Sequence, residues 1–248
     1  MSQQPQRTPE TLRSLLLGTI TGLALLGLAG LAGCAGGPGS GVQIEWVNVV
    51  QFGGIQYVAS TSSIGRAPTD ADVGPVFATV QFKLADNVHD PSYQLKDGDA
   101  AFLDAGTPVS TVRGYAPTFR LVARFASRLT FYEADTDPHA RTGADLLDIG
   151  DKVHAIGVNS QQDGTTELGV VKDPAQVSAL VAMVLHAAVN QRYQERDSAT
   201  YFIAFHLDDG TAVTRAYWLG SGELARGILL PPAFGDAVRH ALAARSAG

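Results

Sequence analysis

Beyond the first forty residues, the spacing of hydrophobic and polar residues differs between two halves of the chain. Between residues 42 and 149, apolar and polar side chains alternate over short stretches, which is the period of a β-strand. Val42, Ile44 and Trp46 fall on one face of the first stretch, and Gly53-Gly54 suits a hairpin turn into the second. Polar segments with Pro or Gly separate these and the later runs at residues 75–84, 119–125 and 128–134. The pattern predicts a small all-β domain, a sandwich or a barrel, over residues 42–150.

From residue 151 to residue 248 the pattern predicts two hairpins, each followed by a helix. Residues 152–160 and 166–171 fit one hairpin, and residues 200–207 and 212–219 fit another, with Asp209-Gly210 as a strong turn signal. These parts predict a ββαββα domain in which a four-stranded sheet carries both helices on one face. The fold class predicted for the whole chain is therefore α+β.

The two predicted helices have clear starts and apolar stripes. In the first, over residues 173–190, Asp173 caps the helix, Pro174 suits its first position and Gln176 completes a capping box. The second helix covers residues 231–245. Helical spacing defines an apolar stripe on each, made of Val177, Leu180, Val181 and Val184 in the first, and of Phe234, Val238, Ala241 and Leu242 in the second.

The two hairpin–helix units resemble each other. Their Asp-Gly-Thr turns match at a shift of 46 residues and their helices at a shift of 57, and residues 220–230 absorb the difference. The strands after the turns do not keep a common phase, so internal duplication and convergence on common supersecondary parts both stay open. Residues 200–245 also look like a module of uncharacterised bacterial extracytoplasmic proteins, which carries no known activity with it.

The first 41 residues have a different character. Residues 1–13 are polar with a slight positive charge, residues 14–33 are uncharged and apolar, and "LAGC" ends at Cys34, the only cysteine. This order is the layout of a secretory signal. The ending resembles the lipobox of bacterial lipoproteins. In that family the cysteine thiol receives a diacylglycerol, the signal peptide, here residues 1–33, is removed, and further acylation with chains such as palmitate usually follows.

The resemblance implies a lipid-anchored protein on the extracytoplasmic side of the cell membrane. Cys34 is then the lipid-attachment residue, two or more acyl chains give stable anchoring, and residues 34–41 form a flexible linker. An uncleaved transmembrane helix is the alternative, because residues 14–33 are long enough to span a bilayer. Its five glycines and the position of the cysteine favour the lipoprotein. Both alternatives place the later residues outside the cytoplasm.

Charge and cysteine content narrow the classes of partner. Without residues 1–33 the chain has 16 basic and 23 acidic residues, a net charge of −7. This balance argues against nucleic acid as a partner. With Cys34 carrying lipid, no thiol remains for a disulfide, a cysteine-based zinc site or a nucleophile. The predicted partners are the membrane, through the anchor, and an unidentified protein or small-molecule ligand, with no cofactor.

Candidate chemistry is limited to clusters of Asp and His. No nucleophile elbow, zinc-protease motif or phosphate loop occurs. The acidic loop with Asp135, Asp137 and His139 lacks the glycine and the glutamate of a calcium loop, so Asp-capped turns fit it better, and a turn-rich loop also fits the second acidic segment better. The histidines have no metal-site spacing. The residues considered are Asp135, Asp137 and His139; Asp86, His89, Asp90, Asp97 and Asp99; His154, His186, His206 and His240; Tyr217 and Trp218 as an aromatic platform; and Arg113 and Arg120 as anion holders.

These observations predict an extracytoplasmic lipoprotein that acts by binding, as an accessory subunit, a scaffold or a ligand-binding module. No catalytic, cofactor or metal residue is predicted. Two alternatives stay open: a metal-assisted hydrolase whose Asp and His groups meet only in the fold, and a solute receptor of a transporter, which usually has two lobes around a cleft.

Cys34→Ser is expected to abolish lipid attachment and normal processing, because only a thiolate is nucleophilic enough to take the lipid. Intact mass of the membrane-extracted parent should correspond to a chain that begins at Cys34 and carries acyl groups. A Cys34→Ser variant that is processed normally and stays as firmly membrane-bound as the parent would contradict the lipoprotein prediction.

Overall fold

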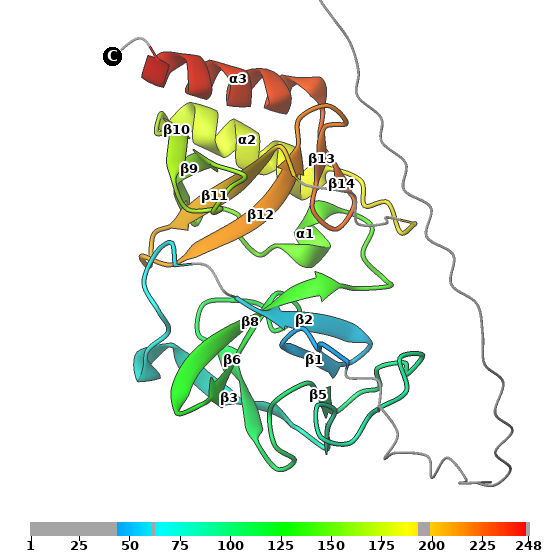
Figure 1. Cartoon of the computed structure of the whole chain (residues 1–248). Helices are drawn as coiled ribbons and strands as arrows, with labels where there is room; N and C mark the ends of the chain where they lie inside the picture. The colour runs from blue at the N-terminus through cyan, green and yellow to red at the C-terminus, as the bar shows by residue number, and fades with distance from the viewer. Residues whose placement is uncertain (1–43, 61–62, 193–198, 247–248) are drawn as a thin grey trace, which may run out of the picture. The chain divides into compact units, whose positions relative to one another are not determined.

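The computed structural model describes residues 44–60, 63–192 and 199–246 (Figure 1). Cys34, the signal segment, the linker and Val42 lie outside the described residues. Residues 41–248 form one compact unit. In its described part, two β-sheets and three α-helices give a mixed α+β fold, as the sequence predicts.

The first sheet contains eight strands in the order β3-β6-β7-β8-β2-β1-β5-β4. The outermost strands β3 and β4 follow each other in sequence, so the two ends of this order are joined by a short stretch of chain. The strands are β1 (Val49–Phe52), β2 (Ile55–Ala59), β3 (Val73–Thr79), β4 (Phe82–Lys83), β5 (Asp99–Ala100), β6 (Pro108–Val112), β7 (Arg120–Phe125) and β8 (Arg128–Thr136), with the 3-10 helix η1 (Asp70–Asp72) before β3.

The predicted hairpin between β1 and β2 is confirmed, because Phe52 pairs with Ile55 across Gly53-Gly54. Both glycines have positive φ, which a side chain at either position would strain. The prediction of a strand from residue 42 is wrong for residues 44–48, since β1 begins only at Val49. The partner strand β2 ends at Ala59, whose N–H donates to the Asn48 carbonyl at 2.8 Å, so the residues before Asn48 have no partner in β2.

The second sheet contains six strands in the order β10-β9-β11-β12-β13-β14, with every neighbouring pair antiparallel. Both predicted hairpins are confirmed, but the prediction of four strands is wrong. Residues 220–230 fold into a short hairpin that extends the sheet beyond β12. The strands are β9 (Val153–Asn159), β10 (Glu167–Val171), β11 (Tyr201–Leu207), β12 (Ala212–Trp218), β13 (Glu223–Leu224) and β14 (Ile228–Leu229).

The helices are α1 (Gly143–Leu146), α2 (Pro174–His186) and α3 (Pro232–Ser246). The Asp173 carboxylate caps α2 by accepting the Gln176 backbone N–H at 2.9 Å, as predicted. The predicted stripe of α2 is buried in full. The helix ends four residues earlier than expected, because Ala188 and Val189 form β-bridges with Thr142 and Ile228.

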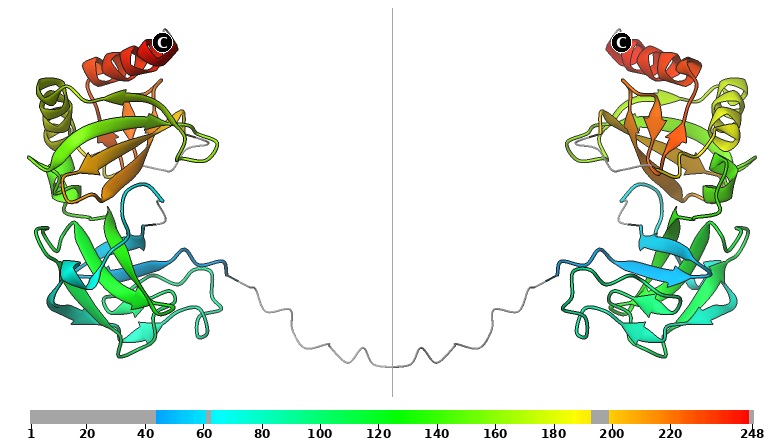
Figure 2. Two further views of the ribbon diagram at one scale, coloured as in Figure 1. Left: turned by 90° about the vertical axis from the view of Figure 1, so that its left-hand side faces the viewer. Right: turned by 90° about the vertical axis from the view of Figure 1, so that its right-hand side faces the viewer.

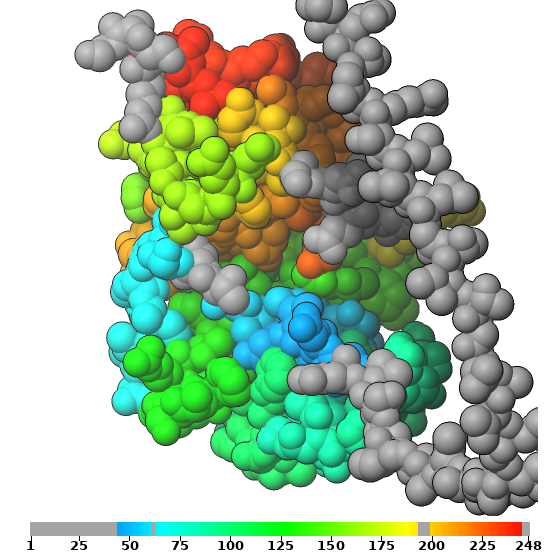
Figure 3. Space-filling model, in the orientation of Figure 1, coloured from blue at the N-terminus to red at the C-terminus, as the bar shows by residue number. Residues whose placement is uncertain are grey.

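One hydrophobic core joins the helices to the second sheet. It contains the α2 stripe, Phe234, Val238 and Ala241 of α3, and inward side chains of β9, β11 and β12. Figure 2 shows α2 and α3 beside these strands. The first sheet has a separate core with Tyr57, Leu121 and Tyr132. In Figure 3 the first sheet, blue to green, and the later segments, yellow-green to red, occupy separate regions of one face. Within the described residues, no helix combines the length and apolar character needed to cross a membrane.

Phe234→Ala is expected to lower the free energy of unfolding by about 3–5 kcal/mol, because it leaves a cavity in the second core. The Phe234 side chain is 0 % exposed and packs edge-on against Tyr217, with ring centroids 5.5 Å apart. Phe82→Ala is the matched control, since Phe82 is 37 % exposed. Urea unfolding of both variants measures the difference, and equal losses would contradict the core assignment.

Candidate functional site

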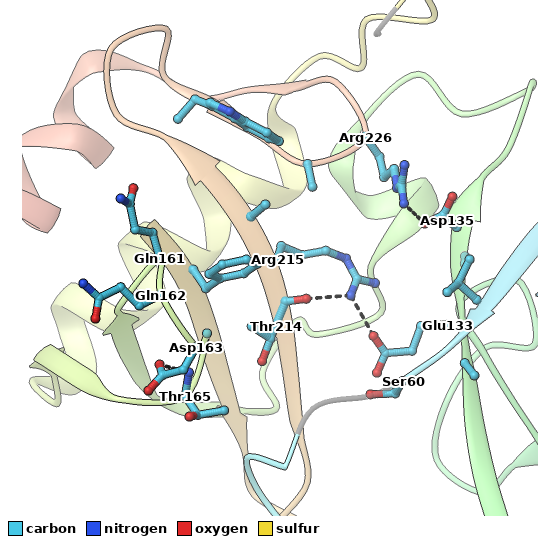
Figure 4. Close-up of a pocket in the computed structure, with 18 residues that line it drawn as sticks. Ser60, Glu133, Asp135, Gln161, Gln162, Asp163, Thr165, Thr214, Arg215 and Arg226 are labelled. Carbon is cyan, nitrogen blue, oxygen red and sulfur yellow. Dashed lines mark hydrogen bonds and ion pairs between the residues drawn. The ribbon is translucent and has the colours of Figure 1, made fainter. Parts of the chain in front are cut away.

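An open cavity of about 550 Å³ lies between the two sheets (Figure 4). The first sheet contributes the end of β2 and residues Glu133 and Asp135 of β8. The second sheet contributes the β9–β10 turn, one residue of β11 and the middle of β12, and the β13–β14 turn adds Arg226. Segments far apart in sequence therefore converge on one space, as ligand sites commonly require.

Glu133 lies at the wall of this cavity, between two arginines from different sheets. Its Oε1 accepts a hydrogen bond from Arg120 Nη2 of β7 at 2.8 Å, and its Oε2 accepts one from Arg215 Nη1 of β12 at 2.7 Å. Arg120 also donates to Thr211 Oγ1 at 3.1 Å. The Arg120–Glu133–Arg215 triad thus connects the first sheet to the second.

The triad is buried and carries an excess positive charge. The Arg120 side chain is 0 % exposed and that of Glu133 is 6 % exposed. Burial raises the pKa of Glu133, but the charges and hydrogen bonds of Arg215 and Arg120 outweigh burial and hold that pKa below its ordinary value. The guanidinium of Arg120 also lies 4.7 Å from the Phe131 ring centroid and 4.8 Å from that of Tyr115. Those rings offset part of the desolvation cost of the cation.

Two nitrogens of the triad remain without a hydrogen-bond partner. They are Arg120 Nε and Arg215 Nη2, and both are buried. Buried hydrogen-bond donors are almost always paired in folded proteins, so two unpaired donors in one cluster are unusual. Arg215 is one of the residues that line the cavity, although its unpartnered Nη2 is itself buried.

A second ion pair, between Asp135 and Arg226, lines the same cavity. Both residues sit on irregular backbone. The β2–β8 register shifts between Gln56 and Tyr57, which pair with Thr136 and Ala134, so Asp135 is the extra residue of a β-bulge. Arg226 has φ of 74°, a left-handed conformation that strains any residue with a Cβ.

Asp135 is less strongly stabilised as an anion than Glu133. Burial raises its pKa, and the opposing charges of Arg226 and Arg215 do not fully offset that effect. Its side chain is 17 % exposed, against 31 % for Arg226. The pair also lines a smaller adjoining cavity of about 170 Å³, so it belongs to both spaces.

The opposite side of the cavity is aromatic and polar. Phe202 of β11 pairs with Ala216 of β12, and Trp218 stands two residues further along β12, so the three share one face of the sheet. The β9–β10 turn adds Gln161, Gln162 and Asp163 (Figure 4). Hydrogen bonds from the Thr166 hydroxyl and backbone lower the pKa of Asp163 to about 2, because they stabilise its charged form.

Of the residues singled out from the sequence, Asp135, Arg120 and Trp218 belong to this site or to its triad. Tyr217 does not join Trp218 in a platform, because neighbouring strand residues face opposite sides and Tyr217 is buried in the core. Arg113 lies at an exposed turn and does not meet the buried Arg120.

The acidic loops fold into turns. Asp137 accepts the His139 backbone N–H at 2.7 Å, and Asp90 accepts that of Ser92 at 2.9 Å. Asp97 accepts a backbone N–H from Gly54. The remaining residues of the second loop are engaged or exposed: Asp86 pairs with Lys83, Asp99 accepts from Tyr93 and Lys96, and His89 is exposed.

Two of the histidines meet although their spacing does not indicate it. The ring centroids of His154 and His206 are 6.2 Å apart. Burial lowers the pKa of His206, with opposing influence from Glu167. His186 contacts the Ala182 carbonyl, and His240 is exposed. Over the described parts of the chain, no group of three or more His, Cys, Asp or Glu side chains is placed to hold a metal ion.

The sequence reasoning missed Glu133, Arg215, Arg226 and Phe202. A signal exists for two of them, because Glu133 and Arg215 each interrupt a strand of mostly apolar or small residues. Charges in such positions are rarely buried unless paired. The sequence around Arg226 gives no comparable signal, because what distinguishes this residue is its left-handed backbone conformation, which the sequence pattern does not show.

Comparison with known proteins finds no matching family model, no matching curated protein and no matching solved structure.

Glu133→Gln is expected to lower the free energy of unfolding at pH 7 by about 3 kcal/mol, because it leaves two buried cations without a counter-charge. The depressed pKa of Glu133 means that its stabilisation is complete above the ordinary glutamate pKa of about 4.3 and is lost as pH falls further. The difference in the free energy of unfolding between the parent and Glu133→Gln, measured by urea unfolding, should therefore become smaller below about pH 4.

Arg124→Gln is the control for this experiment. It breaks the ion pair between Arg124 and Asp70, in which the Arg124 side chain is 61 % exposed and the Asp70 side chain is 82 % exposed. The free energy of unfolding is therefore expected to fall by at most about 1 kcal/mol. A Glu133→Gln loss no larger than this would show that the triad does not stabilise the fold.

Proposed function

We propose that this protein is a lipoprotein, anchored through Cys34 on the extracytoplasmic side of the cell membrane, that acts by binding a small molecule in the cavity between its two sheets. The observation that carries the binding role is the cavity itself. About 550 Å³ of space is lined by two ion pairs and two aromatic side chains from separate segments. A cavity of that size with a few placed polar groups is typical of small-ligand sites.

The anchored location is supported by the order of residues before the described part of the chain. A polar start, an uncharged apolar stretch and "LAGC" precede a Gly- and Ser-rich linker. A tether of this kind suits a protein that captures a solute outside the cytoplasm. A receptor that passes a solute to a transporter is one form of the proposed role.

The predicted domain organisation belongs to the same proposal: a small all-β domain, a sandwich or a barrel, over residues 42–150 and a ββαββα domain over residues 151–248. The sheets support the division, because β1–β8 end at Thr136 and β9–β14 begin at Val153. The adjacency of β3 and β4 supports a barrel. In this arrangement the binding cavity lies between the two domains, a frequent position for ligand sites.

A binding role is favoured over a hydrolase activity because the carboxylates of the cavity are already engaged in ion pairs or hydrogen bonds. Glu133 and Asp135 are paired with guanidinium groups, and Asp163 is held by its own turn. A general base needs a free lone pair directed at substrate or water. Glu133 and Asp135 instead orient Arg215 and Arg226, which line the cavity.

Trp218→Ala is expected to weaken binding of the neutral fluorescent probe N-phenyl-1-naphthylamine by about tenfold, the equivalent of 1.4 kcal/mol, because Trp218 lines the cavity. The protein for this titration is residues 34–248 with Cys34→Ser, produced directly without residues 1–33. It carries no acyl chains, which would themselves take up the probe. Trp46→Phe is the control, since the only other tryptophan does not line the cavity. Equal probe affinity in the Trp218 variant and the parent would contradict the proposed site.

A further inference from the structure

Two separate departures from regular backbone meet in one ion pair at the cavity wall. Asp135 is the extra residue of the bulge in β8, and Arg226 has φ of 74° in the β13–β14 turn. Gly227, the next residue, also has positive φ and is the residue type that this conformation favours. A turn that keeps an arginine in such a conformation retains strain, and strained residues of this kind gather at binding sites.

The charged groups around the pair are unequal in number. Two carboxylates, those of Glu133 and Asp135, form ion pairs with three guanidinium groups, those of Arg120, Arg215 and Arg226. Glu133 is shared between Arg120 and Arg215, and Arg215 Nη2 has no hydrogen-bond partner. Three guanidinium groups from β7, β12 and the β13–β14 turn therefore share two carboxylates of β8, while the third carboxylate that lines the cavity, Asp163, lies on its opposite side and is held by its own turn.

The two carboxylates differ in how firmly they are held. Glu133 receives hydrogen bonds from two guanidinium groups and is almost fully buried. Asp135 pairs with one guanidinium, is more exposed, and lies where the 550 Å³ and 170 Å³ cavities adjoin. Of the two, Asp135 is the counter-ion that an incoming anion can replace.

We propose that the cavity binds a small organic anion, in which a carboxylate, phosphate or sulfonate is attached to a planar ring. The anionic group replaces Asp135 as the partner of Arg226, close to Arg215, and the ring lies against Phe202 and Trp218. This inference rests on the proposed binding function and specifies its ligand class. Guanidinium groups suit such ligands because their planar donors match two oxygens of one anionic group.

A matched pair of fluorescent probes tests the proposal on the mature Cys34→Ser chain. The anionic probe is 1-anilinonaphthalene-8-sulfonate, and the neutral probe is N-phenyl-1-naphthylamine, which has the same rings without the sulfonate. Arg226→Gln is expected to weaken binding of the anionic probe by about tenfold and to leave the neutral probe within about twofold. Asp135→Asn is expected to strengthen binding of the anionic probe several-fold, because it removes the competing carboxylate.

Arg124→Gln serves as the matched control, since it removes a guanidinium from an exposed ion pair of β7 outside the cavity. It should change neither affinity. Thermal unfolding of each variant shows whether the fold is intact, and the opposite signs expected for Arg226→Gln and Asp135→Asn separate anion recognition from general damage.

The outcomes distinguish this inference from the function on which it rests. Binding of the neutral probe, with an anionic affinity that neither substitution changes, overturns the anion proposal and leaves the binding cavity in place. Neutral binding without anionic binding does the same. Failure of the parent to bind either probe overturns the proposed function and the anion proposal together.

Discussion

One buried carboxylate joins the two sheets at the wall of the cavity. Glu133 of β8 holds Arg120 of β7 and Arg215 of β12, and Arg120 reaches Thr211 in the β11–β12 turn. Removing three charged groups from water is costly, and their mutual attraction repays that cost only when the geometry is close to ideal. The contacts of 2.7 and 2.8 Å and the rings around Arg120 offset part of that cost, while Arg120 Nε and Arg215 Nη2 stay without a hydrogen-bond partner.

This arrangement also explains why space remains between the sheets. Most buried apolar side chains of each sheet pack into a separate core, although Phe119, just before β7, belongs to the second core. The lining of the cavity between the sheets includes charged and polar groups. Charged groups that are paired across it keep their oxygens and nitrogens in fixed positions, and the intervening volume stays open. The bulge at Asp135 and the strained turn at Arg226 then direct a second pair into the same volume. The proposed site for an anionic ligand rests on the guanidinium groups of Arg215 and Arg226, at a place where apolar packing is incomplete.

Local patterns predicted the parts of the fold whose stability is local. Asp173, Pro174 and the stripe from Val177 to Val184 specify the start and the buried face of α2 almost without reference to the rest of the chain. Gly53-Gly54 and Asp209-Gly210 specify hairpins for the same reason. The patterns failed where a partner segment decides the outcome. Residues 220–230 became two strands because β12 offered a free edge, and residues 44–47 stayed irregular because β2 ends at Ala59.

The candidate site was harder to predict, because its residues are defined by what they meet. The sequence indicates Arg120 as a possible anion holder, yet its partners in the structure lie 13 and 91 residues away in sequence. Adjacency in sequence groups Trp218 with Tyr217, although strand alternation places the Tyr217 ring in the core. The sequence by itself predicted the α+β class, the hairpins and the main helix, since these depend on composition and on neighbours within a few residues. Its resemblance to a lipoprotein signal at residues 1–34 stays a prediction. Only the tertiary structure decided which charges are buried, which pair across the sheets and where the cavity lies, because pairing and desolvation depend on contacts between distant segments.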